Sequence, residues 1–280
     1  MPSSVHFARL IIASKEHQMN LKNNTILITG GTSGIGLELA RQLLQLGNTV
    51  IITGRDQSKL NSTKQMLPGI YTVQSDVSNP QEIITLYERV TYEFPNLNML
   101  INNAGIMRKI DLHDRGRDLE DITREIQTNL AGPIRMVQQF LPHLKKQKKA
   151  TIVNVSSGLA FIPLPISPIY CATKAALHSY TLSLRVQLKN TNITVFELAP
   201  PGTETPLFRG EFTKDDLGGM KGMDVETLSK RTIAGLQKDN LEIRPGLSSV
   251  LQLMSRIAPQ FMLKAIGTKS VDIMLAQVRQ

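Results

Sequence analysis

Tyr170 and Lys174 are the two side chains whose types and spacing most directly indicate chemistry. They are four residues apart in a stretch of helical character, which places both on one face of a helix. A free phenol has a pKa near ~10 and exchanges protons poorly at neutral pH. An ammonium ~4 Å away stabilises a phenolate by about 4 kcal/mol at an effective dielectric constant of ~20, lowering the pKa by up to ~3. The spacing therefore predicts a tyrosine that serves as a general acid or base.

Further polar residues upstream fit the same site. Ser157 precedes Tyr170 by thirteen residues and follows an apolar run, Thr151–Val155, typical of a buried strand. Ser156 is its rival, but side chains alternate along a strand, so we expect the two hydroxyls on opposite faces. Asn129 lies in a predicted helix, where asparagine is unfavourable by propensity, and this favours a functional reason for it.

A glycine-rich segment, Thr29 to Gly36, follows the first predicted strand and opens a helix. Glycines let the backbone turn sharply and approach a pyrophosphate, and the N–H groups and dipole of the following helix favour that anion. The glycines alone are weak evidence, but their place between a strand and a helix strengthens it. The segment predicts a dinucleotide site, and an ordinary glycine-rich turn is the alternative.

Short apolar runs that alternate with helical patterns indicate how these residues are positioned. Strands apolar on both faces, alternating with helices, are typical of a parallel sheet covered on both sides. We therefore expect the α/β class, a three-layer doubly wound parallel sheet (Rossmann fold) of about seven strands. The predicted strands are Thr25–Thr29, Thr49–Thr53, Ile70–Gln74, Asn98–Ile101, Thr151–Val155, Ile193–Leu198 and a weaker Leu241–Ile243.

Five motifs, in order along the chain, resemble those of the short-chain dehydrogenase/reductase (SDR) family. They are Thr29-Gly30-x-x-x-Gly34-x-Gly36, Asn102-Asn103-Ala104-Gly105, Ser157, Tyr170-x-x-x-Lys174 and Pro201-Gly202. The resemblance covers about residues 20 to 246 and fits the compact single-domain subgroup. Within the family the chain is most similar to a bacterial DltE-like oxidoreductase branch.

The resemblance implies roles for individual residues. The catalytic set is Asn129, Ser157, Tyr170 and Lys174. The cofactor-binding set is Gly30, Thr32, Ser33, Gly34, Ile35, Gly36, Arg55, Lys59, Asp76, Asn103, Ala104, Gly105, Tyr170, Lys174, Pro201, Gly202, Thr203 and Thr205. No metal site is expected, because the five histidines and Cys171 show no ligand spacing.

The end of the second strand sets the expected cofactor. An acidic residue there would bind the adenosine ribose of NAD. The segment instead reads Thr53-Gly54-Arg55-Asp56, and the guanidinium of Arg55 is a planar donor fork suited to phosphate. We predict NADP(H), with Ser33 and Lys59 as helpers at the 2′-phosphate. Asp56 keeps NAD(H) as the alternative.

Composition excludes several other classes of protein. With 41% hydrophobic and 20% charged residues, the 280-residue chain is typical of globular proteins, and its single cysteine allows no internal disulfide. No run approaches the ~20 apolar residues of a membrane span. The net charge of +9 could indicate a polyanion, but no nucleic-acid motif accompanies it. We expect a cytoplasmic protein without a nucleic-acid partner.

Three parts of the chain are expected. Residues 1–18 form a leader that is disordered or lies upstream of the true start, and residues 19–246 form the Rossmann domain. A substrate lid at about 206–223 belongs to that domain, and residues 247–280 form an amphipathic helical tail. Residues 158–169, the lid and the tail are expected to frame the substrate. The tail packs on its own domain or a second subunit, or contacts a membrane.

The sequence predicts an enzyme, a short-chain NAD(P)-dependent alcohol dehydrogenase or carbonyl reductase. It transfers a hydride between the nicotinamide and a carbonyl or secondary alcohol, and the apolar segment Leu159–Pro165 favours an apolar substrate. Family resemblance implies a homodimer or homotetramer. An NADP-binding, redox-sensing regulatory protein without turnover is the alternative, and an extended-branch epimerase or dehydratase is a third.

Overall fold

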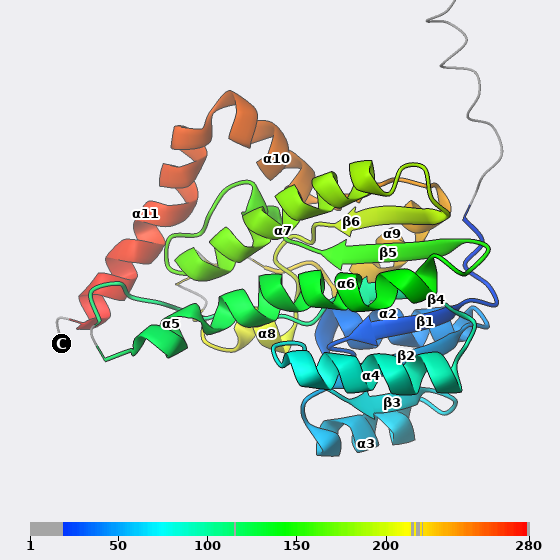
Figure 1. The fold of residues 1–280 in the computed structure, drawn as a ribbon. Coiled ribbons are helices and arrows are strands. Elements are labelled where there is room, and N and C mark those ends of the chain that lie inside the picture. The colour runs from blue at the N-terminus through cyan, green and yellow to red at the C-terminus, as the bar shows by residue number, and fades with distance from the viewer. Residues whose placement is uncertain (1–18, 115, 214–215, 217–218, 220, 279–280) are drawn as a thin grey trace, which may run out of the picture.

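Seven parallel strands form a single sheet (Figure 1). The computed structural model describes residues 19–278, except 115, 214–215, 217–218 and 220, so the predicted leader lies outside the described residues. The sheet order is β3-β2-β1-β4-β5-β6-β7. The strands are β1 Thr25–Thr29, β2 Thr49–Gly54, β3 Tyr71–Gln74, β4 Leu97–Asn102, β5 Ala150–Val155, β6 Ile193–Leu198 and β7 Glu242–Ile243. The predicted doubly wound parallel sheet is confirmed, and the predicted strand ends agree with these to within one residue.

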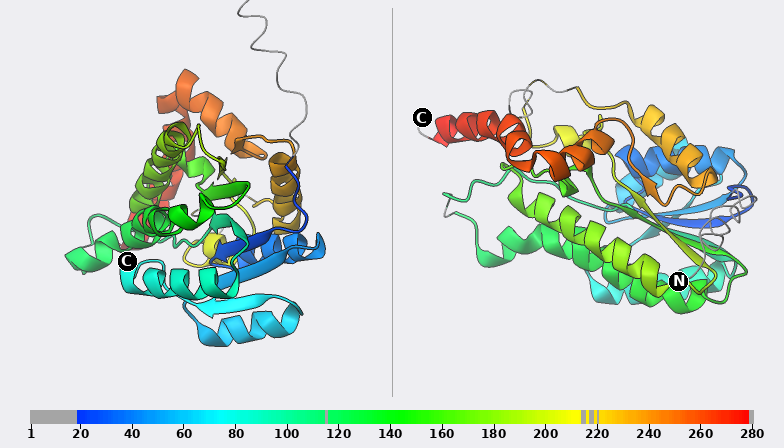
Figure 2. Two further views of the ribbon diagram at one scale, coloured as in Figure 1. Left: turned by 45° about the vertical axis from the view of Figure 1, so that its right-hand side comes forward. Right: turned by 90° about the horizontal axis from the view of Figure 1, so that it is seen from above.

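Helices cover both faces of the sheet (Figures 1 and 2). Their bounds are α2 Gly34–Gln45, α3 Gln57–Met66, α4 Pro80–Glu93, α5 Leu119–Ile126, α6 Gly132–Leu144, α7 Pro168–Gln187, α8 Pro206–Arg209, α9 Val225–Gln237, α10 Leu247–Ile257 and α11 Pro259–Val278. Two short turns complete the set, the π-helix η1 Gln127–Ala131 and the 3₁₀-helix η2 Gly158–Ala160.

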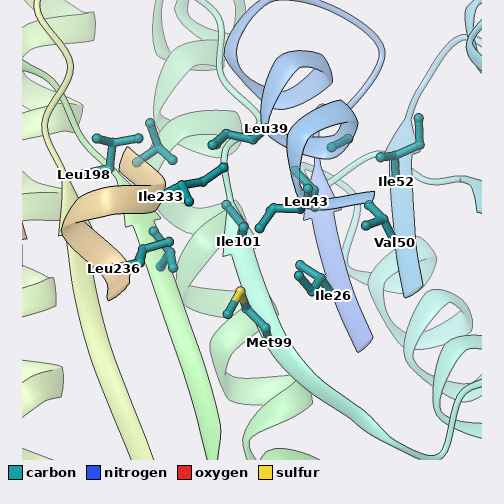
Figure 3. Close-up of a cluster of buried hydrophobic side chains, with 14 of the residues drawn as sticks. Ile26, Leu39, Leu43, Val50, Ile52, Met99, Ile101, Leu198, Ile233 and Leu236 are labelled. Carbon is teal, nitrogen blue, oxygen red and sulfur yellow. The ribbon is translucent and has the colours of Figure 1, made fainter. Parts of the chain in front are cut away.

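Strand alternation divides the core between the two faces. Ile26 and Ile28 of β1 pack on one side with residues of α2 and α9, whereas Leu27 packs on the other with residues of α4, α6 and α7. Figure 3 shows the first of these layers, in which Leu39 and Leu43 of α2 lie over Ile26 and Val50 of the sheet. Because strands buried on both faces must be apolar throughout, the continuous apolar runs of the sequence were a sound guide to them.

The strand order places a crevice at the carboxyl end of the sheet. The chain leaves β1 toward β2 on one side, and returns to β4 on the other side of β1. Loops after β1 and β4 therefore diverge, and ligands of doubly wound folds bind in the crevice this creates. In Figure 1 the strands run toward the left, and α8, α10 and α11 lie on that side of the sheet.

The tail differs from the single amphipathic helix expected for it. It forms two helices, α10 and α11, which meet at an angle (Figure 1), with a break at Ala258 and Pro259. Proline disfavours helical backbone in the residue before it and has no N–H to continue the ladder, so the helix stops there. Helix α11 contributes Ile266, Val271 and Met274 to a third apolar cluster that also includes Leu164 and Phe208, and α10 packs against α11 and η2.

Candidate active site

A cavity of about 580 Å³ opens at the carboxyl ends of β1, β2, β4 and β5. Most of the predicted site residues line it. They are Gly30, Thr32, Ser33, Gly34, Ile35, Arg55, Lys59, Asp76, Asn103, Ala104, Gly105, Ser157, Tyr170, Pro201, Gly202, Thr203 and Thr205. Gly36, Asn129 and Lys174 are the other three, and they lie behind this lining. The structure thus brings together residues spread from position 30 to position 205.

The turn between β1 and α2 depends on glycine at particular positions. Gly30 and Gly34 adopt left-handed backbone angles, with φ of 66° and 53°, which favour glycine. A Cβ on Gly36 would lie 2.4 Å from the carbonyl oxygen of Gly30 and from Nδ2 of Asn103. The turn is therefore packed too tightly for any side chain at Gly36.

Asn103 connects this turn to the loop after β4. Its Nδ2 donates to the carbonyl oxygens of Thr29 at 2.9 Å and Gly30 at 3.0 Å. The Thr29 hydroxyl in turn accepts from the backbone N–H groups of Asn103 and Ala104, both at 3.0 Å. The two loops that diverge from the crevice are therefore held in a fixed relation at its base.

One end of the cavity is charged. Arg55 is exposed, and its Nη1 lies 3.8 Å from Oδ2 of Asp76. The other oxygen of Asp76, Oδ1, accepts from the N–H and hydroxyl of Ser78. Lys59 lies 4.0 Å from Asp56, whose carboxylate caps α3 through the N–H of Lys59. Both Arg55 and Asp56 line this end of the cavity, and the Asp56 carboxylate also caps α3.

Tyr170 and Lys174 lie at the other end of the cavity. The Tyr170 side chain is buried on α7, and Nζ of Lys174 lies 5.6 Å from the centroid of its ring. Lys174 is also buried, and its ammonium donates to the carbonyl of Val155, the last residue of β5, at 2.8 Å. Ser157 lies two residues beyond that carbonyl and caps η2 through the N–H of Leu159. Strand β5 and helix α7 thus supply the two halves of this cluster.

The direction of the Tyr170 pKa corrects the sequence-based expectation. Burial raises the pKa of Tyr170 above its ordinary value, and the neighbouring Ser157 side chain opposes this only in part. Burial also lowers the pKa of Lys174 to about 8. The expected lowering of the Tyr170 pKa assumed a pair in a solvated medium with an effective dielectric constant of ~20, and it omitted the cost of removing both groups from water. In the protein alone, that desolvation is the larger effect.

Asn129 occupies a local break in its helix. It lies in the π-helix η1 between α5 and α6, fully buried. Its Oδ1 accepts from the N–H of Ile106 at 2.9 Å, and its Nδ2 donates to the Ile106 carbonyl at 2.8 Å and to the Thr173 hydroxyl at 3.2 Å. Asn129 therefore ties the loop after β4 to helix α7, one residue before Lys174.

Sequence reasoning missed part of the cavity wall. The missed residues are Ile106, Met107 and Thr128, which line it. The C-terminal tail, which was expected to frame the substrate, also lines the cavity, through Leu247, Leu251, Ala265, Ile266 and Ser270. The expected substrate segments are represented by Leu159 and Leu164 in the first and Pro206, Leu207 and Phe208 in the second. Part of the predicted lid, positions 214–215, 217–218 and 220, lies outside the described residues. Apolar residues carry no local sign of their function, so only the general location of these walls was predictable.

The comparison with protein families gives a direct result. Residues 24–216 match the family model described as short chain dehydrogenase. That range contains all of the motifs that surround the cavity. The chain belongs to the short-chain dehydrogenase family.

Relatives of this short-chain dehydrogenase include bacterial oxidoreductases. It is 47% identical over 225 residues to the "uncharacterized oxidoreductase DltE" of Bacillus subtilis (strain 168), covering 80% of this chain and 89% of the relative. It is 32% identical to the "NADP-dependent 3-hydroxy acid dehydrogenase YdfG" of Escherichia coli O6:H1, covering 62% of this chain and 71% of the relative. The expected place in a DltE-like oxidoreductase branch is confirmed.

Solved structures share the fold of this short-chain dehydrogenase. A short chain dehydrogenase from Burkholderia cenocepacia J2315 in complex with NADP superposes with a TM-score of 0.75 at 24% identity, covering 88% of this chain and 98% of the other. A 3-ketoacyl-(acyl-carrier-protein) reductase from Brucella melitensis complexed with NADH gives a TM-score of 0.70 at 27% identity, with coverages of 82% and 94%.

Two features are absent from the described residues of this short-chain dehydrogenase. No helix among them is long and apolar enough to cross a membrane. Within the same residues, no group of three or more His, Cys, Asp or Glu side chains is arranged to hold a metal ion.

Proposed function

We propose that this protein is an NADP(H)-dependent oxidoreductase that transfers a hydride between the nicotinamide and the carbonyl or secondary alcohol of an apolar substrate. The observation that carries this proposal is the pairing within one cavity of a phosphate-binding turn and a Tyr170–Ser157 pair. An alcohol dehydrogenase or carbonyl reductase activity follows from these groups.

The residues present fit a dinucleotide. Gly30 and Gly36 carry no side chain, and a Cβ at either position would meet other atoms of the turn. The backbone at the N-terminus of α2 is therefore open to a pyrophosphate. Asp76, Asn103 and Ala104 would contact the adenosine portion, and the turn at Pro201 and Gly202 would face the nicotinamide portion. When bound, the nicotinamide supplies or accepts the hydride.

The charged end of the cavity favours NADP(H) over NAD(H). Arg55 offers its guanidinium at the rim, with Lys59 and Ser33 beside it. The acidic residue of this segment, Asp56, is turned to the N-terminus of α3. A relative and a solved structure of the same family have NADP in their names, which agrees with this preference.

Tyr170 is the proposed general acid for reduction and the general base for oxidation. Ser157 would hold the substrate oxygen beside the phenol, while Lys174 and Asn129 lie behind it. A positively charged nicotinamide would favour the phenolate, opposing the rise in pKa that burial causes. Tyr170 and Lys174 also form part of the cofactor site in this proposal, Tyr170 from the cavity wall and Lys174 from behind it, and they would hold the nicotinamide ribose.

The substrate half of the cavity supports an apolar substrate. The charged residues that line the described cavity are Arg55, Asp56, Lys59 and Asp76, and all four lie at the adenosine end. The wall around Tyr170 is built from apolar residues such as Met107, Leu164 and Ile266. Among the described lining residues, a carboxylate there would meet no cationic side chain, so the loss of its water would be costly. We therefore infer an uncharged carbonyl compound or alcohol, in contrast to the 3-hydroxy acid named for one relative.

The assembly and location are also proposals. Leu182 and Val186 of α7 are exposed in the single chain, which supports a homodimer or homotetramer formed through this helix. The single cysteine, Cys171, is free and buried, as suits a reducing, cytoplasmic setting.

A panel of neutral aldehydes, ketones and secondary alcohols, followed by the absorbance of NADPH, tests this function. We expect turnover of apolar members, and little turnover of 3-oxo acids of the same length. Tyr170→Phe should lose turnover and keep NADPH binding, measured by the quenching or enhancement of NADPH fluorescence. Equal turnover by the phenylalanine variant would overturn the mechanism.

A further inference from the structure

Glu197 is a buried carboxylate that the proposed chemistry does not use. It lies on β6 with 2% of its surface exposed. The Ser156 hydroxyl donates to its Oε1 at 2.5 Å, and Nδ1 of His178 lies 2.7 Å from its Oε2. A carboxylate removed from water needs partners on both oxygens, and these two contacts provide them.

The two partners of Glu197 lie close in sequence to the reacting groups, Ser156 just after β5 and His178 on α7. Ser156 lies between Val155, whose carbonyl accepts from Lys174, and Ser157. His178 is four residues after Lys174, on the same side of α7. The Glu197 carboxylate therefore bridges the end of β5 and the helix that bears Tyr170. Both elements are thereby held to β6.

His178 also contacts the substrate side. Its ring packs edge-on against the ring of Phe161, with centroids 5.2 Å apart and an interplanar angle of 77°. Phe161 follows η2, and its neighbour Leu159 lines the cavity. A change at His178 is therefore transmitted to the substrate wall as well as to α7.

We propose that Glu197 and His178 are positioning residues, which fix the distance between Ser157, just after β5, and Tyr170 and Lys174 on α7 through the Ser156–Glu197–His178 bridge. This inference rests on the proposed function, because it assigns the bridge to the reaction performed there. A misplacement of reacting groups by about 1 Å can lower a rate by about 10²-fold, so a bridge of three side chains has a measurable effect.

Several charged groups surround the bridge. Glu197 raises the pKa of His178 above its ordinary value, chiefly through their hydrogen bond, with Glu242 acting in the same direction and burial and Arg244 opposing them. Glu242 is itself held by Arg185 and Arg244. The imidazolium is lost as the pH rises through the raised pKa, and with it the charge–charge part of the bridge. A step in the pH profile that depends on His178 is therefore expected above pH ~6.5.

The experiment compares Glu197→Gln and His178→Gln with His143→Gln as the matched control. His143 is a buried histidine on α6 that lies close to the carbonyl oxygen of Leu97 and away from the described cavity. NADPH-dependent reduction of an apolar aromatic aldehyde is measured across pH, with circular dichroism as the test of folding. We expect kcat to fall about 10- to 100-fold in both test variants, with the KM for NADPH within about twofold of the control. The His178-dependent step should be absent from their pH profiles.

A second readout does not require turnover. The ultraviolet titration of tyrosinate in the NADP⁺ complex, with Tyr170→Phe as the blank, reports the ionisation of Tyr170. The midpoint pH of this titration should rise in Glu197→Gln and His178→Gln, because Lys174 is less firmly held. It should be unchanged in His143→Gln. Folded test variants that match the control in both kcat and midpoint overturn the inference. If wild-type protein reduces no carbonyl compound, the proposed function fails, and the titration then decides on the bridge alone. If Glu197→Gln does not fold, the variant His178→Gln supplies both readouts, since the His178 side chain is 23% exposed.

Discussion

Nζ of Lys174 donates to the carbonyl oxygen of Val155 at 2.8 Å and lies 5.6 Å from the centroid of the Tyr170 ring. The acceptor is the last residue of a central strand, so the sheet itself fixes the position of the amine. Burial lowers the pKa of Lys174 to about 8, because the cation has lost most of its water. A bound dinucleotide with anionic phosphates and hydroxyl-rich ribose would restore part of what the amine has lost. In the protein without a cofactor, the desolvated Lys174 ammonium therefore lowers the stability of the fold.

The desolvation of Lys174 predicts that the free energy of unfolding depends on pH. The folded pKa of Lys174 lies below the unfolded value of 10.5, so the unfolded chain binds more protons between pH 8 and 10.5. The destabilising contribution is full below pH 8 and disappears as the pH rises through this window. Relative to Lys174→Met, the free energy of unfolding of the wild type should therefore rise by roughly 3 kcal/mol between pH 8 and 10.5.

Urea unfolding at several pH values measures this difference. Lys64→Met, at an exposed position on α3, is the control and should follow the wild type across the window. A constant difference between the wild type and Lys174→Met at all these pH values would show that the amine is not desolvated.

Arg55→Gln should change the choice of cofactor. The guanidinium is exposed, and its contact with Asp76 at 3.8 Å is a surface ion pair, so little stability depends on it. A hydrogen bond to a charged group contributes about 1.5–3 kcal/mol, which corresponds to a roughly 10- to 100-fold rise in the KM for NADPH. The KM for NADH should change little. Steady-state kinetics with both cofactors measures the ratio, and Arg89→Gln on α4, which pairs with Glu93 at the surface, is the control. An unaltered ratio would show that another group holds the 2′-phosphate.

The fold was predictable because its signals are local. Each strand of a doubly wound sheet is a continuous apolar run, and the turn after β1 requires glycine at fixed positions. The break between α10 and α11 also has a local signal, because Pro259 stops α10 before it and is the first residue of α11. The expectation of one amphipathic helix was wrong because it counted apolar spacing across that proline.

The candidate site was predictable in its residues but not in its energetics. Motif spacing predicted that Ser157, Tyr170 and Lys174 belong to one site, and the structure places them close together. Their pKa directions depend on burial by the helices and loops around them, which no local pattern expresses. The partnership of Glu197 with His178 was likewise hidden, since the two are nineteen residues apart and meet only when β6 lies beside α7.

Gly36→Ala should disturb the phosphate-binding turn. A Cβ at this position would lie 2.4 Å from both the Gly30 carbonyl oxygen and Nδ2 of Asn103, and the first of these atoms is backbone that cannot easily move. Inserting an atom into a packed site typically costs about 1–3 kcal/mol. We therefore expect a loss of that size in the free energy of unfolding and weaker NADPH binding, measured by denaturant titration and NADPH fluorescence. Unchanged values of both would show that the turn relaxes without loss.

Ile266→Ala on α11 should alter the preference for substrate size. Ile266 is partly buried in the cluster that includes Tyr170 and Phe208, and it lines the cavity. A lost methylene contact in an apolar pocket costs about 1–3 kcal/mol, so kcat/KM for an aldehyde that reaches this wall should fall at least ~10-fold. A short aldehyde that does not reach Ile266 should be turned over as before. Phe261→Ala is the control on the same helix, because that ring is 66% exposed and does not line the cavity. A series of straight-chain aldehydes of increasing length measures the effect, and equal losses for short and long members would mean that α11 acts on folding and not on substrate selection.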